Sequence, residues 1–254
     1  MARLPSVFIS HGSPMHALDP GAAGEAWAEL GRRLGKPRAI LIASAHWETN
    51  VPMLTGNPKP ETIHDFSGFP QPLYKLRYPA PGAPDVAQRA QALLKDAAID
   101  GSRGLDHGAW APLLYMYPKA DIPVVQISVQ PASGPRHHVE VGRSLKKLSE
   151  EGVLIIGSGH MTHNLRDWAR GAGKPQPYAR EFSDWVREKM EKRDLEALAD
   201  YRSLAPHAAR AHPTEEHFLP LFFALGAGGH QGSPERIYDG IEGGVLAMDS
   251  YVFH

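Results

Sequence analysis

Cysteine, net charge and long apolar runs are all scarce in this sequence of 254 residues. Without Cys, the chain has no disulfides, no thiolate metal ligands and no cysteine nucleophile. Its 27 Lys and Arg nearly balance 28 Asp and Glu, giving a net charge of -1 and no strong field that would attract nucleic acid or an anionic membrane. No segment approaches the roughly 20 apolar residues that span a bilayer. We therefore expect a cytoplasmic protein whose partner is a small molecule rather than nucleic acid or a membrane.

The distribution of apolar residues predicts an α/β fold. Short aliphatic runs bounded by Gly, Pro or Ser alternate with longer segments of helical period, which is typical of a sheet flanked by helices. The predicted strands are Ser6–Ser10, Ala39–Ser44, Pro123–Ser128, Val153–Gly157 and Met248–Phe253. All but the last are apolar on both faces, so we expect them at the centre of the sheet. No break in composition divides the chain, and we predict a single catalytic domain over residues 1–254.

Seven segments have the period or the end signals of helices. They are Ala22–Leu34, Pro84–Ala97, Ala111–Tyr117, Pro135–Ser149, Tyr178–Lys192, Asp194–Tyr201 and Thr214–Leu225. Between Pro58 and Gly82 the chain is rich in Pro and aromatic residues and has no clear period, so we interpret it as a lid or binding loop. Gly171–Pro177 and Gly226–Ser233 are typical of surface loops.

Histidine is abundant, with 14 residues, and several follow predicted strands. Three of the buried strands lead into histidines at their carboxyl ends, namely His11, His46 and the pair His160 and His163. This edge is where ligands and catalytic groups gather in open α/β sheets, because strand ends fix positions while loops leave space. A histidine at one strand end is usually just packed or hydrogen-bonded, but three similar strand ends indicate a shared site.

His217 stands in a different setting. Thr214 is a plausible helix N-cap, and Glu215 and Glu216 would occupy the first turn. His217 would then lie in the opening turn of an apolar helix, whose positive end disfavours an imidazolium and preserves the neutral form that binds metals. Together with the strand ends, this histidine predicts a mononuclear metal site for Zn, Fe or Mn. A polar network in the core is the alternative.

The other histidines carry weaker signals. His64 and His107 each stand in a turn-like setting beside an acid, which could orient the imidazole or only form the turn. Six further histidines we expect at the surface: His16, His137, His138, His207, His230 and His254.

Several spaced motifs go further than composition. They are Ser10-His11-Gly12-Ser13-Pro14, Ser44-Ala45-His46-Trp47, Ile63-His64-Asp65-Phe66, Asp106-His107-Gly108, His163-Asn164-Leu165 and Glu216-His217-Phe218-Leu219-Pro220. Together they resemble the class III extradiol ring-cleaving dioxygenases, specifically the DOPA dioxygenase branch. The resemblance extends from about Pro5 to Gly228, which is nearly the whole chain.

The resemblance implies a fold, a cofactor and a reaction. The fold is an α/β sandwich with a central mixed sheet flanked by helices on both faces, and the cofactor is one divalent metal ion. The reaction opens a catechol ring beside its hydroxyl groups with dioxygen. His11, His46 and His217 match the family's metal positions, and His163 matches a histidine next to the metal that is an acid/base residue or a fourth ligand. His107 matches a residue near the substrate.

In the ring-opening reaction a base must take a catechol proton and an acid must later return one. His163 can serve both steps, because the pKa of an imidazole lies near neutrality. The aromatic segment from Phe66 to Tyr78, with Trp47 and Trp110, would surround the ring and exclude water. Plain core packing is the alternative for each of these aromatic residues. His160 matches no ligand position.

The predicted ligand set departs from the wider class, which binds Fe(II) with two histidines and one carboxylate. Here the third position is His217, and Glu215 and Glu216 are only adjacent. A three-histidine or four-histidine set also suits Zn(II), so the cofactor is Fe(II) for dioxygenase activity or Zn(II). A zinc hydrolase with Glu216 or His163 as base therefore stays open, as does a non-enzymatic binding protein of the same fold. The sequence does not indicate the oligomeric state.

Overall fold

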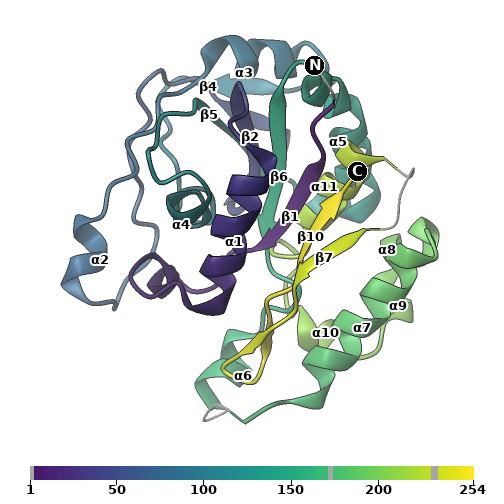
Figure 1. The fold of residues 1–254 in the computed structure, drawn as a ribbon. Helices are drawn as coiled ribbons and strands as arrows, with labels where there is room; N and C mark the ends of the chain where they lie inside the picture. The colour runs from purple at the N-terminus through teal and green to yellow at the C-terminus, as the bar shows by residue number, and fades with distance from the viewer. Residues whose placement is uncertain (1–2, 171–173, 230–233) are drawn as a thin grey trace.

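A mixed eight-stranded sheet forms the centre of the computed structural model, which describes residues 3–170, 174–229 and 234–254 (Figure 1). The strand order is β4-β3-β5-β2-β6-β1-β10-β7. Its strands are β1 Ser6–Ser10, β2 Ala39–Glu48, β3 Met53–Thr55, β4 Ala98–Asp100, β5 Val124–Val129, β6 Val153–Gly159, β7 Glu235–Tyr238 and β10 Ser250–Phe253. Parallel pairing joins β5, β2, β6 and β1, and β10 pairs antiparallel with both β1 and β7. The predicted central mixed sheet is confirmed.

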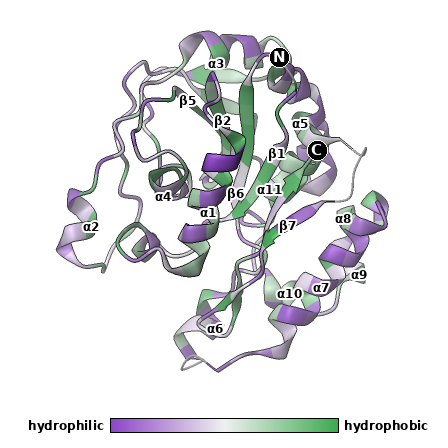
Figure 2. Cartoon of the chain, in the orientation of Figure 1, coloured by the Kyte–Doolittle hydropathy of each residue, from purple (hydrophilic) through white to green (hydrophobic). Residues whose placement is uncertain are grey.

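Each face of the sheet has its own apolar core. In β2, Ile40 and Ile42 join the cluster that contains Trp27 and Trp110, whereas Leu41 points to the opposite cluster. This alternation follows from the period of two in a strand, and it explains why the central strands are apolar throughout. Figure 2 shows these strands in green between more polar helices. Helices therefore cover both faces, as expected.

The main helices are long enough to bury one apolar face each. Their bounds are α1 Gly21–Leu34, α3 Pro84–Gln91, α4 His107–Met116, α5 Gly134–Glu150, α7 Pro177–Glu191 and α11 Leu219–Gly228. The shorter ones are η1 Pro14–Ala17, α2 Gln71–Lys75, η2 Pro131–Ser133, α6 Leu165–Arg170, α8 Leu195–Ala199, α9 Tyr201–Leu204 and α10 Ala208–Ala211. In Figure 1, α7 to α10 lie together below β7, while α1 and α4 lie on the opposite side of the picture.

Helices α5 and α11 approach each other closely because glycines face each other across the contact. A Cβ on Gly142 would lie 2.0 Å from the carbonyl oxygen of Phe223, and one on Gly226 would lie 2.1 Å from that of Val139. No Cβ atom can lie that close to a carbonyl oxygen, so neither position can carry a side chain. The two glycines thus let α11 pack directly on α5 and against the sheet.

Two predicted helix bounds are wrong for identifiable reasons. Helix α11 begins at Leu219, not at Thr214, because Pro220 is tolerated only in the first turn, where its missing N–H has no intrahelical partner. His217 therefore precedes the helix. Helix α4 begins earlier than predicted, at His107, because the Asp106 carboxylate caps it by accepting from the N–H of Ala109.

Other differences concern short or irregular segments. Helix α3 ends at Gln91 rather than Ala97, since the chain must become extended for β4. The segment between Pro58 and Gly82 contains the short helix α2. The predicted loop at Gly226 is helical to Gly228, and residues 230–233 of that loop, with His230, lie outside the described residues, as do residues 171–173.

A small antiparallel hairpin completes the fold near the carboxyl end of the chain. Its strands are β8 Ile241–Glu242 and β9 Leu246–Ala247. The side chain of Thr162 accepts a hydrogen bond from the N–H of Ala247 and donates to the carbonyl of Val245, which ties the hairpin to the end of β6. Among the described helices, none is both long and apolar enough to cross a bilayer.

Candidate metal centre

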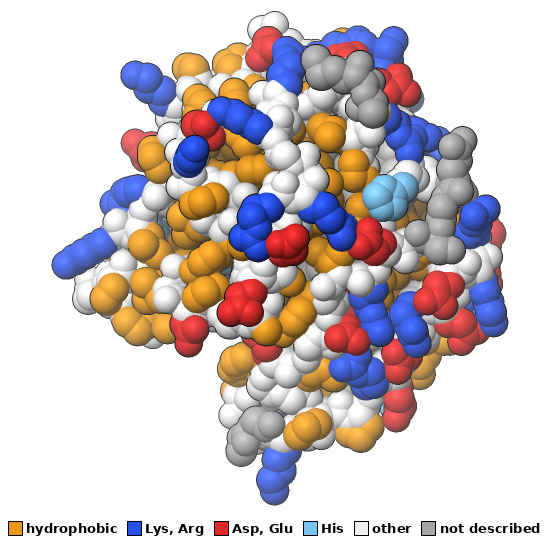
Figure 3. Space-filling model, in the orientation of Figure 1, with side chains coloured by type: hydrophobic (Ala, Val, Ile, Leu, Met, Phe, Trp, Pro, Cys, Tyr) orange, Lys and Arg blue, Asp and Glu red, His pale blue; other side chains and the backbone are white. Residues whose placement is uncertain are grey.

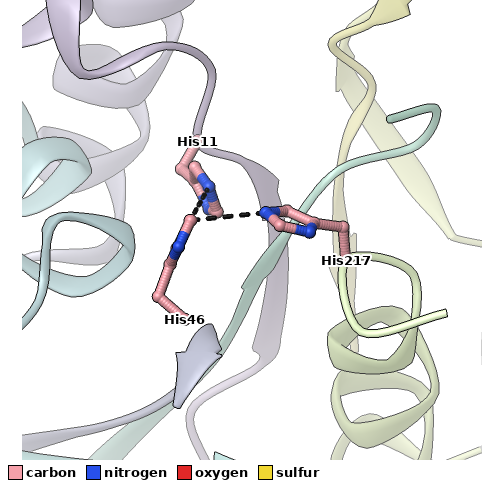
Figure 4. A group of neighbouring side chains, drawn as sticks. All are labelled: His11, His46 and His217. Atoms are coloured by element: carbon pink, nitrogen blue, oxygen red, sulfur yellow. Dashed lines mark hydrogen bonds between the residues drawn. The ribbon is translucent and has the colours of Figure 1, made fainter. Parts of the chain in front are cut away.

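Three histidines from distant parts of the chain meet at the carboxyl edge of the sheet. His11 follows β1, His46 lies near the end of β2, and His217 precedes α11. Strands β2, β6 and β1 are adjacent and parallel, so their carboxyl ends lie side by side. The Nε2 atom of His46 lies 3.0 Å from Nε2 of His11 and 3.3 Å from Nε2 of His217 (Figure 4). The three Nε2 atoms thus converge on one point.

The other ring nitrogen of each histidine has its own partner. Nδ1 of His46 lies 3.4 Å from the Asp65 carboxylate, and Nδ1 of His217 lies 2.8 Å from that of Glu216. Nδ1 of His11 lies 3.0 Å from the hydroxyl of Ser158. That hydroxyl donates its proton to the carbonyl of Gly108 and so accepts from the imidazole. The partners of His11 and His217 accept a hydrogen bond from Nδ1 and so favour the tautomer with a lone pair on Nε2. The charge of the nearby Asp65 carboxylate favours the same tautomer in His46.

Three lone pairs that face one another repel unless a cation lies between them. Tetrahedral zinc with Zn–N bonds of about 2.0–2.1 Å would separate its nitrogen ligands by about 3.3 Å, close to the spacing here. Burial, and then the charge of nearby histidines, lowers the pKa of His11 and of His217 well below the usual value. Burial and the charge of His107 lower the pKa of His46 to about 3. The residues therefore fit a divalent metal ion, which binds neutral imidazoles.

His163 lies beside this cluster. Its ring is stacked on that of His217, with centroids 3.5 Å apart and an angle of 11° between the planes. Burial, followed by the charge of His46, lowers the pKa of His163 to about 4, so the imidazole is neutral near pH 7. Its ring faces the cavity described below. The structure thus places His163 beside His217, one of the three candidate metal ligands.

His160 is a member of the cluster that the sequence did not assign. It follows β6 directly, its ring centroid lies 4.8 Å from that of His11, and its Nε2 lies 3.3 Å from the carbonyl of Gly12. The side chain is 2% exposed. Burial, and then the charge of His163, lowers the pKa of His160 well below its usual value. His160 therefore packs against the rings of His11 and His163.

The acid that contacts His107 is Asp65, not its neighbour Asp106. The Asp65 carboxylate accepts from both the backbone N–H and Nδ1 of His107, each at 2.9 Å. Burial favours its protonated form, but the hydrogen bond from His107 and the charges of His107 and His46 lower the pKa of Asp65 to about 2. Asp65 belongs to the segment between Pro58 and Gly82, called the lid segment below. Its carboxylate therefore hydrogen-bonds His107 and lies near His46.

Asp106 does not line the cavity, and its contacts are structural. Its side chain is fully buried, accepts a hydrogen bond from Ser44 at 2.7 Å, and also contacts Gln126 and Arg103. Burial, together with the charge of Asp65, raises the pKa of Asp106. These contacts fix the start of α4 against β2, and they leave no acidic function for Asp106 in the cavity.

A cavity of about 570 Å³ opens above the cluster. The five histidines of the cluster line it, and so does His107. The lining also includes a set of apolar side chains: Met15, Phe66, Phe69, Leu165, Trp168 and Leu246. Its volume is typical of a site for a small organic ligand.

Several expectations about this region need correction. Phe66 and Phe69 line the cavity as expected, but Trp47 and Trp110 do not. Trp110 is fully buried and donates to the carbonyl of Ile63, and Trp47 packs under the guanidinium of Arg103. His64 hydrogen-bonds the carbonyl of Leu76, within the lid segment. Packing therefore explains these three side chains.

Two histidines predicted at the surface are buried. His16 contacts Glu242 at 2.8 Å, and this partner outweighs the effect of burial and raises the pKa of His16. His138 is 2% exposed, accepts from the N–H of Gln130 and lies 2.7 Å from the carbonyl of Gly134. The prediction failed because the sequence does not show which polar partner a buried imidazole will contact.

The α/β sandwich, the histidine cluster and the cavity together indicate the class of protein: a candidate metalloprotein that binds a small molecule. Residues 5–245 match the family described as the catalytic LigB subunit of aromatic ring-opening dioxygenase, and the chain belongs to this family. It is an enzyme, an extradiol ring-cleaving dioxygenase, as the sequence resemblance implied.

Named relatives cover almost the whole chain. The 4,5-DOPA dioxygenase extradiol of Beta vulgaris is 43% identical over 254 residues, with 97% of this chain and 95% of that protein covered. The protein of the same name from Escherichia coli K12 is 40% identical, with 97% and 93% covered. A crystal structure of an uncharacterised Escherichia coli K12 protein superposes with a TM-score of 0.84 at 34% identity, covering 99% of this chain and 100% of that chain.

Proposed function

We propose that this single-domain enzyme binds one divalent metal ion through His11, His46 and His217 and opens the ring of a catechol with dioxygen. The observation that carries the proposal is that the Nε2 atoms of these three histidines converge in the lining of a cavity large enough for an aromatic ring. Fe(II) is the ion that would support the dioxygenase reaction, and a cytoplasmic location is part of the same proposal. DOPA, after which the relatives are named, is the first substrate to test.

The metal ion would supply positions where the two catechol oxygens and dioxygen bind side by side, and it would lower the pKa of the catechol. The residues of the chain position and protonate the substrate. His163 is neutral near pH 7 and faces the cavity, so it can take a hydroxyl proton and return it later. We leave open whether His163 also acts as a fourth ligand.

His107 has a positioning role in the proposal. Its Nδ1 is held by Asp65, which leaves Nε2 for a polar group of the substrate. The ring of Phe66 lies edge to face against His107, with centroids 5.6 Å apart. The lid segment therefore carries both the acid that orients His107 and an aromatic ring that keeps water away from it.

The proposal can be tested by anaerobic reconstitution with Fe(II), followed by measurement of dioxygen uptake with simple catechols and DOPA. We expect uptake and a yellow ring-opened product with Fe(II), and neither with a zinc-loaded sample, because zinc has no redox chemistry. In His163→Ala we expect kcat to fall by about 10²–10⁴, as for loss of a general acid/base.

The matched control is His138→Gln, which removes a buried histidine that does not line the cavity and should leave dioxygen uptake unchanged. No uptake with any catechol, from protein that binds Fe(II) in one equivalent, would contradict the proposed substrate. Equal loss of uptake in both variants would show that His163 acts only through folding.

A further inference from the structure

His16 directly follows Met15 of the cavity lining, and both of its ring nitrogens face acceptors. Nδ1 lies 3.0 Å from the carbonyl oxygen of Ser13, and Nε2 lies 2.8 Å from Oε1 of Glu242 in β8. A carbonyl and a carboxylate have no proton to donate, and a neutral imidazole carries one N–H. Both contacts are therefore hydrogen bonds only when His16 is an imidazolium.

We infer that His16 is a positioning residue, whose imidazolium holds the β8–β9 hairpin against η1 and so fixes part of the cavity lining. The inference rests on the proposed function in one respect, because a catechol is the ligand whose binding it would affect. The attachment of the hairpin itself can be tested without any ligand.

The hairpin connects Glu242 to two residues of the lining. Glu242 is the partner of Leu246 across the hairpin, and it directly precedes Gly243. The ring of Trp168 lies on Gly243, where a Cβ would be 2.5 Å from it. Thr162 holds the other strand, so the ion pair adds a second attachment, on β8. Loss of this attachment would shift β8 and, with it, the side chains of Leu246 and Trp168, which line the cavity.

The imidazole also supports the turn that enters η1. Its ring fills the space beside Gly12, where a Cβ would lie 2.4 Å from the ring. Gly12 has a φ of 72°, which residues other than glycine rarely adopt, and it joins His11 to Ser13. The Ser13 carbonyl accepts a second hydrogen bond from the backbone N–H of His16 at 2.9 Å. His16 therefore links the hairpin to a turn that begins at a candidate metal ligand.

The surroundings of His16 favour its charged form, although the residue is 7% exposed. Burial alone would lower the pKa of His16, but the hydrogen bond and charge of Glu242 raise it above the usual 6.5, with help from the Ser13 carbonyl and the charge of Asp19. A buried charge is tolerated when it is paired and hydrogen-bonded in this way.

The other groups that face His16 carry no charge. Trp27 of α1 lies 5.7 Å from it between ring centroids. At the end of β6, burial and then the charge of His163 lower the pKa of His160 well below its usual value, so His160 is neutral. Glu242 is thus the partner that balances the imidazolium.

The raised pKa sets the pH range of the attachment. The contact is complete below about pH 6.5 and is lost as the pH rises through the pKa of folded His16. A neutral His16 must direct a lone pair at either Ser13 or Glu242, which is repulsive. The hairpin should therefore loosen on the alkaline side.

Nitrogen-15 NMR of His16 in the zinc-loaded protein tests the charge, with His16→Gln to assign the signals. We expect both ring nitrogens to be largely protonated at about pH 6.5. The pKa should fall in Glu242→Gln, because the amide accepts a hydrogen bond but has no charge. A His16 that is mainly neutral at this pH would overturn the inference.

Amide hydrogen exchange of residues 241–247, corrected for intrinsic rates, tests the attachment. At about pH 6, exchange should be about tenfold faster in Glu242→Gln than in the unmodified protein, as for loss of a charge-assisted hydrogen bond. The difference should shrink by about pH 9, where the unmodified protein has itself lost imidazolium. A difference of equal size at both pH values, or none at about pH 6, would overturn the inference.

Glu181→Gln is the matched control, because Glu181 contacts His207 at 2.7 Å at an exposed site that does not line the cavity. This variant should leave exchange in the hairpin unchanged at both pH values. Faster hairpin exchange in Glu181→Gln would show that loss of any such pair loosens the chain, and would contradict the role given to His16.

Calorimetry with DOPA, on zinc-loaded protein without dioxygen, separates this inference from the proposed function. At about pH 6, Glu242→Gln should bind DOPA several-fold more weakly with unchanged metal content, and the difference should narrow by about pH 9. This pattern without dioxygen uptake by the Fe(II) protein would contradict the function and leave the inference standing. Uptake by the Fe(II) protein, with equal DOPA affinity in Glu242→Gln, would confirm the function and contradict the inference.

Discussion

The inner and outer walls of the cavity are built in different ways. The inner wall is the set of cavity histidines, which lie at the ends of central strands or, for His107 and His217, at or just before the start of a helix. His11 and His160 are 1% and 2% exposed. The outer wall stands on the lid segment, α6 and the β8–β9 hairpin, where Leu165 reaches 58%. Parallel strands fix the positions of atoms within a few tenths of an ångström, as metal binding requires. Loops and short helices can vary in sequence without disturbing that geometry, so they suit the choice of substrate.

The charges of the two walls also differ from those of the outer surface. On the face drawn in Figure 3, Lys and Arg are intermixed with Asp and Glu, in keeping with the net charge of -1. Within the cavity, the acid in the lining is Asp65 of the lid segment, which contacts His107 of the inner wall. If the histidines bind the metal and the apolar residues bind the substrate, changes to the inner wall should alter metal binding. Changes to the outer wall should alter only substrate binding.

The largest effect is expected for His46→Ala, which removes a ligand from the inner wall. We expect metal affinity to fall by more than the roughly 10–100-fold that loss of an outer partner costs. Metal content after dialysis, with competition by a chelator, measures it, and His138→Gln serves as the control. One tightly bound equivalent in His46→Ala would refute the assignment.

Asp65→Asn should have the next largest effect, because the acid is shared by His46 and His107. An amide has one acceptor oxygen, so it cannot accept from both the N–H and Nδ1 of His107 and also orient His46. Metal affinity should fall about 10–100-fold. The same titration checks it, with the exposed Asp85→Asn as control. An unchanged affinity would show that Asp65 serves the substrate side alone.

His138 tests what burial does to a histidine outside the cavity. Burial lowers the pKa of His138 to about 4, below the usual 6.5. Between about pH 6.5 and 4 the unfolded chain binds a proton that the folded chain does not, so the free energy of unfolding falls as the pH falls. The contribution is complete above pH 6.5, and the slope is at most about 1.4 kcal/mol per pH unit. Denaturant unfolding of His138→Gln should show a flatter pH dependence; identical slopes would contradict the buried, neutral state.

Gly243→Ala should have the smallest effect and should be confined to the outer wall. The new methyl group would displace the ring of Trp168, and the positive φ would cost about 1–2 kcal/mol of stability. We expect the affinity for a catechol to fall about fivefold, as for partial loss of one apolar contact, with metal affinity unchanged. Calorimetry and thermal unfolding measure the two effects. A change in metal affinity would break the division between the walls.

The sequence predicted the central sheet well and its edges poorly. Strands β1, β2, β5 and β6 were found because each is a continuous aliphatic run, which local pattern alone identifies. The edge strands β4 and β7 and the neighbouring β3 were missed, since each has three or four residues and depends on another strand for its hydrogen bonds. Met248–Phe253 was placed within two residues of β10.

The candidate site was predicted in part. The strand ends that carry His11 and His46 were visible in the sequence, and the structure brings them together with His217. Asp65 was noted only as a neighbour of His64, and Trp168 was not noted at all. A paired acid some forty residues from His107 leaves no local signal, and one aromatic residue in a short helix is usually core. Assignment of the ligands and of His163 stays a prediction until metal is measured.

The sequence by itself determined which chemistry was available. The absence of Cys left imidazole and carboxylate as the metal-binding groups, and the aliphatic runs placed histidines at strand ends. Only the tertiary structure decided that three Nε2 atoms converge, that Asp65 rather than Asp106 orients His107, and that α6 faces the cavity. These contacts join residues far apart in the chain, so packing decides them, whereas strand patterns depend on neighbours within a few residues.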